Sequence, residues 1–343
     1  MEPSQDAQEG TPFIPPTIHR SSLLDGESYS SYSPCPSTIT PASTSTSAEE
    51  TTNPTACVLG VDEAGRGPVL GPMVYSAFYL PKELEKPLLT QDHSFDDSKV
   101  LTAGVRKNLM QMICSPGHAL HNSCGWAVKV LSARDISAGM LRPGLGVYNL
   151  NAQAMDATIE IIRGVVEQRR INVKEVYIDT IGNPATYQHK LERIFPTLKI
   201  TVAKKADSLY PCVSAASVVA KVTRDIALET CYEALVETNS SQQQQQQNPA
   251  EPTWGSGYPS DSKCVGWLRR DMDSLFGWGN ECRFSWGTAK EMMEGKDAVR
   301  VDWPSNEAEE TGISDFLIGH GPTTSREAKG LENWYGSKVG VSF

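Results

Sequence analysis

The chain has 343 residues and a formal net charge of −10. No stretch is apolar enough to cross a bilayer. The acidic first 55 residues show neither the apolar core of a secretory signal nor the basic character of a mitochondrial presequence. We therefore expect a soluble protein.

The acidity lies at the two ends of the chain. Residues 1–55 hold seven acids and one base, and residues 291–343 hold ten acids and five bases. The middle, residues 56–290, holds 24 acids and 25 bases. Because the distribution of charge matters more than its sum, this middle part can still present a basic groove to nucleic acid.

Composition also predicts the domain boundaries. The Ser/Thr/Pro-rich residues 1–55 hold few large apolar side chains and are expected to be disordered. Residues 56–295 form the expected folded domain, interrupted by a disordered glutamine-rich insertion at 239–253. Residues 296–343 lose periodicity and are expected to dock on a partner. The candidate anchors in this tail are Trp334, Tyr335 and Phe343.

The eight cysteines form no C-x-x-C pair, and the six histidines are scattered, so no zinc site is expected. Free or buried thiols in a reducing compartment fit this pattern.

Apolar runs and their spacing predict the elements of the folded domain. Short apolar runs that stop at turn residues indicate strands, and apolar residues spaced three and four apart indicate helices. In chain order, the prediction is strand 57–61, strand 73–80, helix 105–114, strand 124–131, helix 149–170, strand 176–178, a helix that opens at Pro184, strand 198–203, helix 214–232 and helix 264–276. This order indicates an α/β fold in which an antiparallel meander continues into parallel crossovers, so that helices flank a mixed sheet, with a helical C-terminal extension.

Four carboxylates stand at informative places. Asp62 and Glu63 follow the first strand, Asp179 ends a later one, and Asp207 lies between a strand and an alanine-rich helix. Acids at neighbouring strand ends can converge, and their repulsion is relieved by a divalent cation. Oxygen ligands suit magnesium or manganese, and two such ions could organise phosphodiester cleavage. The alternative is that each acid is an ordinary turn or cap residue.

Other residues are candidates for substrate contact. The turn Gly65-Arg66-Gly67 leaves N–H groups free for a ligand such as a 2′-hydroxyl, and Tyr258 lies in a second glycine-rich turn, where it could stack on a sugar or base. A plain tight turn and a tyrosine packed on the core are the alternatives. The basic candidates for phosphate contacts, each of which could equally be a solvated or ion-paired base, are Lys99, Lys204, Lys205, Lys221 and Arg224.

These motifs, in this order, resemble the type 2 ribonucleases H over residues 56–290. The matching segments are Gly60-Val61-Asp62-Glu63-Ala64-Gly65-Arg66-Gly67-Pro68, Asp97-Ser98-Lys99, Tyr177-Ile178-Asp179-Thr180, Ala206-Asp207-Ser208-Leu209-Tyr210-Pro211, the helix from Ser214 to Asp225, and Gly255-Ser256-Gly257-Tyr258-Pro259. The chain looks most like the catalytic subunits of the eukaryotic enzymes in this family.

The resemblance implies a ribonuclease H-like fold and a metal-dependent endonuclease. Such an enzyme cleaves the RNA strand of RNA–DNA hybrids and incises 5′ of single ribonucleotides in duplex DNA, leaving 3′-hydroxyl and 5′-phosphate ends. It also implies that Asp62, Glu63, Asp179 and Asp207 hold the metal, that Gly65-Arg66-Gly67 senses the ribose, and that Tyr258 packs on the neighbouring deoxyribose. A heterotrimer with two non-catalytic subunits, B and C, is implied as well, together with nuclear work on replication primers and misincorporated ribonucleotides.

Two other functions stay open at this point. The same fold hosts junction resolvases, which would cut an all-DNA duplex equally well. A non-catalytic scaffold would bind hybrids without turnover, although a pure binder gains nothing from acids that face phosphates.

Overall fold

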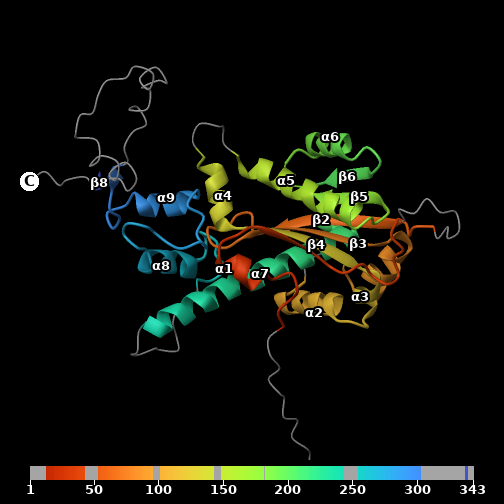
Figure 1. The fold of residues 1–343 in the computed structure, drawn as a ribbon, viewed down its shortest axis with the longest axis horizontal. Coiled ribbons are helices and arrows are strands. Elements are labelled where there is room, and N and C mark those ends of the chain that lie inside the picture. Colours follow the sequence, from red (N-terminus) through yellow and green to blue (C-terminus); the bar gives the residue numbers. More distant parts are fainter. Residues whose placement is uncertain are drawn as a thin grey trace, which may run out of the picture.

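The computed structural model describes residues 13–42, 53–95, 101–142, 148–180, 182–242, 254–302 and 337–338. One mixed sheet in the order β1-β4-β3-β2-β5-β6 forms its centre (Figure 1). The strands are β1 (Tyr29–Tyr32), β2 (Cys57–Ala64), β3 (Met73–Pro81), β4 (Gly125–Leu131), β5 (Val173–Asp179) and β6 (Lys199–Ala203). β2, β3 and β4 are an antiparallel meander, while β5 and β6 run parallel to β2. The predicted mixed sheet is confirmed.

Helices cover both faces of the sheet (Figure 1). On one face lie α2 (Ala103–Cys114), α3 (Ala119–Ser123) and α7 (Pro211–Gln242). On the other lie α4 (Ala133–Met140), α5 (Leu150–Arg163) with its π-helical continuation (Gly164–Gln168), and α6 (Pro184–Ile194). Alternate residues of β2 therefore enter different cores: Val58 packs toward α7, whereas Leu59 and Val61 pack toward α5. Three further short helical segments are Lys82–Leu84, Glu85–Asp92 and Ala206–Ser208.

α7 lies unusually close to β2. The alanines Ala215, Ala216 and Ala220 are fully buried, and a Cβ on Gly60 would stand 2.3 Å from the backbone of Cys212. Real Cβ atoms do not approach a backbone so closely, so Gly60 and the small-residue face of α7 together allow the contact. This packing fixes the strand that carries Asp62 and Glu63.

A smaller aromatic core forms beyond the sheet. It contains Trp254, Trp267 and Trp278, and it is built around α8 (Ser262–Arg270) and α9 (Gly287–Met293). The helix predicted to reach residue 276 ends at Arg270, because Asp273 and Gly277 close a turn through reciprocal backbone hydrogen bonds of 2.7 and 2.9 Å. Two short strands follow this core and pair with each other, β7 (Val301–Asp302) and β8 (Ser337–Lys338).

The N-terminal segment 13–42 differs from the expected disorder. It contains α1 (Arg20–Leu24) and β1, which pairs antiparallel with β4 as the outer strand of the sheet. The segment has few large apolar residues, but the free edge of β4 supplies backbone partners, and Tyr29 is buried. Side-chain bonds add to this, such as the buried 2.9 Å bond between the hydroxyls of Thr17 and Thr223. The prediction was wrong because composition does not reveal an available sheet edge.

Several predicted features lie outside the described residues. These are residues 1–12 and 43–52, most of the glutamine-rich insertion (243–253), and the tail anchors Trp334, Tyr335 and Phe343. The first four residues of the predicted insertion, 239–242, belong to α7. None of the helices that the structure describes is long and apolar enough to cross a membrane.

Two alanine substitutions test the close packing of α7. Gly60→Ala forces a methyl group into the backbone of α7 and should lower the free energy of unfolding by about 3 kcal/mol. Gly266→Ala is the matched control, since nothing lies within 4 Å of its Cβ position on α8. It should raise stability by about 0.5–1 kcal/mol, because alanine favours helix. Urea unfolding measures both, and equal effects would contradict the packing argument.

Candidate active site

The first two predicted carboxylates end strand β2 and leave it on opposite sides. Successive side chains of a strand point to opposite faces. Asp62 turns toward α7, where Ser217 hydrogen-bonds to it, and one of its oxygens accepts a 2.8 Å bond from the Glu63 amide. Glu63 turns toward α5 and lines a cavity there. The end of β2 therefore places one carboxyl group on each face of the sheet.

The other two carboxylates come from the neighbouring parallel strand and the segment after it. Val61 of β2 is in register with Ile178 of β5, which brings Asp179 beside Asp62. Asp179 accepts a 3.0 Å bond from the Ala206 amide, and Asp207 is the next residue and is almost fully buried. The fold thus gathers all four predicted acids at one edge of the sheet.

Burial and mutual repulsion control the protonation of this group. The pKa of Asp62 is raised to about 7, chiefly by burial and also by the nearby Asp179 and Asp207, while the hydrogen bonds from Ser217 and Glu63 act to lower it. Burial and the adjacent Asp62 raise the pKa of Glu63 to about 8. Carboxylates that are this costly to ionise favour a bound cation.

The oxygen-rich donor set suits a hard divalent cation. In the described ranges, however, no three His, Cys, Asp or Glu side chains already form a metal-binding group. Two of the four acids are instead engaged by main-chain amides, those of Glu63 and Ala206.

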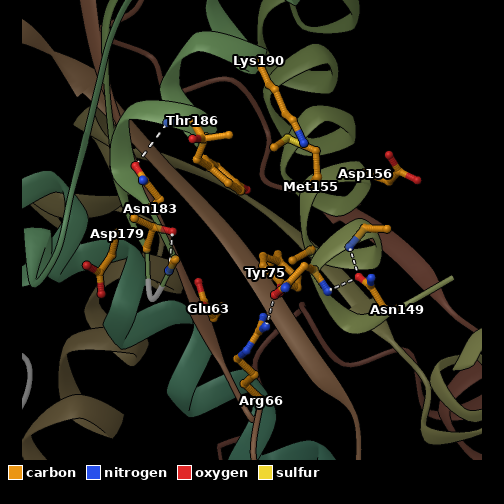
Figure 2. A pocket seen from close by; sticks show the side chains of 16 residues that line it. Glu63, Arg66, Tyr75, Asn149, Met155, Asp156, Asp179, Asn183, Thr186 and Lys190 are labelled. Atoms are coloured by element: carbon orange, nitrogen blue, oxygen red, sulfur yellow. Dashed lines mark hydrogen bonds between the residues drawn. The ribbon is translucent and has the colours of Figure 1, made fainter. Parts of the chain in front are cut away.

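A cavity of about 700 Å³ opens beside Glu63 and Asp179 (Figure 2). Arg66 enters it from the turn after β2 and donates a hydrogen bond to Asn151 at the start of α5. Lys190 reaches it from α6. Asn151 and Lys190 escaped the sequence prediction because each belongs to an ordinary helical pattern, and only the packing of α5 and α6 brings them to the cavity.

The glycine turn and the tyrosine loop form one continuous surface. Gly65 has φ +79°, and Gly257 in the second loop has φ +78°. The Gly257 carbonyl accepts bonds of 2.9 and 3.2 Å from the amides of Val69 and Leu70, which tie the two segments together. A Cβ on Gly67 would lie 3.2 Å from the Tyr258 ring, so the ring rests against the turn. Tyr258 is 40% exposed and available to a ligand.

The predicted basic contacts are placed differently from one another. Arg224 is 6% exposed, and its guanidinium donates a 2.5 Å bond to the Ser256 carbonyl and lies 5.7 Å from the Tyr258 ring centre. It also pairs with Asp225 at 3.1 Å. Arg224 therefore supports the tyrosine loop from beneath, which differs from the expected open phosphate contact. Lys221 is half-buried on α7, and Lys204 and Lys205 are exposed. Lys99 lies outside the described residues.

Two solved structures that share this fold are ribonucleases H. The ribonuclease H2 of Pyrococcus horikoshii is 27% identical, with a TM-score of 0.54, over 69% of this chain and 97% of that one. A ribonuclease HIII, Bst-RNase HIII, shares the fold at 16% identity and a TM-score of 0.51, over 70% of each chain.

Sequence comparison resolves the family. The ribonuclease HII family model matches residues 59–289. The ribonuclease H2 A subunit of Neurospora crassa is 55% identical over 97% of both chains, and its human counterpart is 40% identical over 74% of this chain and 78% of that one. The chain belongs to the ribonuclease HII family, and it is a ribonuclease H enzyme.

The raised pKa of Asp62 predicts how metal-free stability varies with pH. Its folded-state pKa of about 7 lies above the ordinary value of 3.8. Between pH 3.8 and about pH 7, the folded state therefore binds the Asp62 proton more tightly than the unfolded state does. The contribution of Asp62 to unfolding free energy therefore falls as pH rises through this window.

Asp62→Asn removes this dependence. In chelator, the substitution should stabilise the protein by about 2 kcal/mol more near pH 8 than near pH 5. Urea titrations at the two pH values measure the difference. The exposed Asp25→Asn is the control and should show no such difference. An equal gain for Asp62→Asn at both pH values would show that Asp62 is not held neutral in the metal-free protein.

Proposed function

We propose that this ribonuclease H cleaves the RNA strand of RNA–DNA hybrids and incises 5′ of single ribonucleotides in duplex DNA, leaving 3′-hydroxyl and 5′-phosphate ends. The observation that supports this best is the position of the four acids next to the Gly65–Gly67 turn and Tyr258. The proposed reactive centre thus lies next to a surface that can distinguish ribose from deoxyribose.

Magnesium or manganese is the proposed cofactor, with two ions per site. Bst-RNase HIII has been solved in complex with Mn²⁺. In this chain Asp62, Glu63, Asp179 and Asp207 would hold the ions, since their oxygens are hard ligands and two of them resist ionisation without a counter-charge. When bound, such ions supply an activated water and stabilise the departing 3′-oxygen.

The protein's own groups would orient the substrate. Backbone amides of the turn can donate to a 2′-hydroxyl, which a deoxyribose lacks. The exposed face of Tyr258 can pack on the neighbouring sugar, with Arg224 fixing its loop. Arg66 and Lys190, at the cavity, add positive charge for phosphates. The scissile bond would then lie beside the acids.

The functions of a junction resolvase and of a non-catalytic hybrid-binding scaffold are less well supported. A resolvase gains nothing from a turn that distinguishes ribose, and a scaffold gains nothing from buried acids that repel one another. Equal cutting of an all-DNA duplex would favour the first of these functions, and tight hybrid binding without turnover would favour the second.

We further propose that the chain works as the catalytic member of a heterotrimer with non-catalytic B and C subunits, in the nucleus, on replication primers and misincorporated ribonucleotides. The relatives, each named as one lettered subunit of ribonuclease H2, support the assembly. The tail 296–343 is the proposed docking segment. Co-purification of the full chain with tagged partner subunits, compared with a chain ending at residue 295, tests the assembly, and imaging of a fluorescent fusion tests the location.

A duplex that carries one ribonucleotide tests the activity. With magnesium, the full-length chain, co-expressed with its partner subunits, should incise on the 5′ side of that ribonucleotide and leave the all-DNA duplex intact. Asp179→Asn should lower kcat at least about 1,000-fold, since it removes a charge at the reacting centre. Gel analysis of the products measures both. The matched control is the exposed Asp25→Asn, which should cut normally.

Tyr258 should matter at the junction between ribose and deoxyribose. Tyr258→Ala should reduce kcat/KM on the single-ribonucleotide duplex about 10- to 100-fold, the range for loss of one stacking contact. Tyr258→Phe keeps the ring and should retain most activity. Phe276→Ala removes another exposed ring, 75% accessible in the aromatic core region, and should have no effect. A normal rate for Tyr258→Ala would remove this residue from the proposed substrate surface.

A further inference from the structure

The largest fully buried side chain of the described residues is the cationic side chain of Arg283. Burial of a charge is costly unless hydrogen bonds compensate for it. No carboxylate in the described part of the chain forms an ion pair with Arg283. Burial and the nearby Arg224 lower the pKa of Arg283 to about 9, so the side chain still carries its charge near neutral pH. Within the described residues, the fold therefore keeps a buried cation that forms no ion pair with an acid.

All three nitrogens of this guanidinium bind carbonyl groups of the turn after β2. Nη2 donates to Gly65 at 2.6 Å, Nη1 to Arg66 at 3.1 Å, and Nε to Gly71 at 3.0 Å. The next carbonyl, that of Gly67, accepts a 3.0 Å bond from the indole of Trp286, whose ring lies 4.8 Å from the Arg283 guanidinium. The carbonyls of three consecutive turn residues are thus all held by side chains of the segment 283–286.

Anchoring these carbonyls also fixes where the amides point. The described peptide bonds are all trans, and in a planar trans peptide the N–H points opposite to the C=O. The N–H groups of Arg66 and Gly67 must therefore face away from the buried guanidinium. Gly67 is followed by Pro68, which has no N–H. Within the described ranges, neither of these two amides has a protein acceptor.

The backbone around Arg283 holds the two segments in register. The Arg283 amide donates to Val69 at 2.9 Å, and the Gly71 amide donates to Glu281 at 2.8 Å. The paired segments lie more than 210 positions apart in the sequence, as the separations of 212 to 218 for the side-chain bonds show. The turn is therefore shaped by the C-terminal aromatic core as well as by β2.

We infer that Arg283 is a positioning residue, which holds the Gly65-Arg66-Gly67 turn so that its amides face a substrate 2′-hydroxyl. The inference rests on the proposed function, in which this turn senses ribose. Arginine suits the task because its rigid fork can bind three carbonyls at once, whereas a lysine ammonium is a single flexible point and methionine offers no donor.

Kinetics of the full-length enzyme with Arg283→Lys and Arg283→Met test the inference. On a duplex with one ribonucleotide, Arg283→Met should lower kcat about 100-fold, because a misplaced contact group costs about that much. Arg283→Lys should fall between this variant and the wild type. An all-DNA duplex of the same sequence, used as a competitive inhibitor, should keep its inhibition constant within about twofold, since phosphate contacts alone hold it.

Two further variants separate orientation from stability. Trp286→Phe removes the bond to Gly67 but keeps an aromatic ring beside Arg283, and it should cause a smaller loss of kcat. This variant also carries the test if Arg283→Met does not fold. Ile161→Val, on the buried face of α5, should lower the melting temperature and leave kcat unchanged.

The possible outcomes are distinct. Wild-type kcat in both Arg283 variants would overturn the inference and leave the proposed function intact, as would a parallel loss of all-DNA inhibition and melting temperature. A wild-type enzyme that does not cut the ribonucleotide duplex would instead overturn the proposed function itself.

Discussion

Electrostatic repulsion among the clustered acids is the constraint on which the rest of this structure depends. Four carboxyl groups from three separate segments meet where β2 and β5 end. Two of them, Asp62 and Glu63, have pKa values raised well above those of ordinary carboxyl groups. A rigid scaffold is needed to hold these acids close together against their repulsion. The meander on one side of β2, the parallel strand β5 on the other, and the close contact of α7 at Gly60 together supply that rigidity.

The same scaffold holds both the acids and the proposed substrate-binding surface. β2 delivers Asp62 and Glu63 and then passes directly into the glycine turn, so the acids and the turn cannot move independently. α7 supplies Ser217 to Asp62 at one point and Arg224 to the tyrosine loop about two turns later. One strand and one helix therefore set both the reacting centre and the surface that would distinguish sugars.

The sequence predicted the mixed sheet and the meeting of the acids because their patterns are local: apolar runs end at Asp62 and at Asp179, and parallel strands align their ends. It did not predict features that depend on distant partners. Arg224 has the spacing of a surface base. It is buried because the tyrosine loop, which is distant in sequence, packs over it. Arg283 lies in a segment without periodicity, and its carbonyl partners belong to the other end of the domain. The ordering of residues 13–42 likewise depends on an edge that β4 provides.

The outer strand β1 has a consequence for how the chain folds. Its partner β4 is synthesised about 100 positions later, so the N-terminal segment must wait, unpaired, while the meander forms. Once β1 is in place, the outer edge of the sheet is this strand, Tyr29–Tyr32, which is shorter than β4 and offers a shorter template to another molecule. The N-terminal segment thus covers the edge of β4 with a shorter edge, and it can do so only after the sheet has formed.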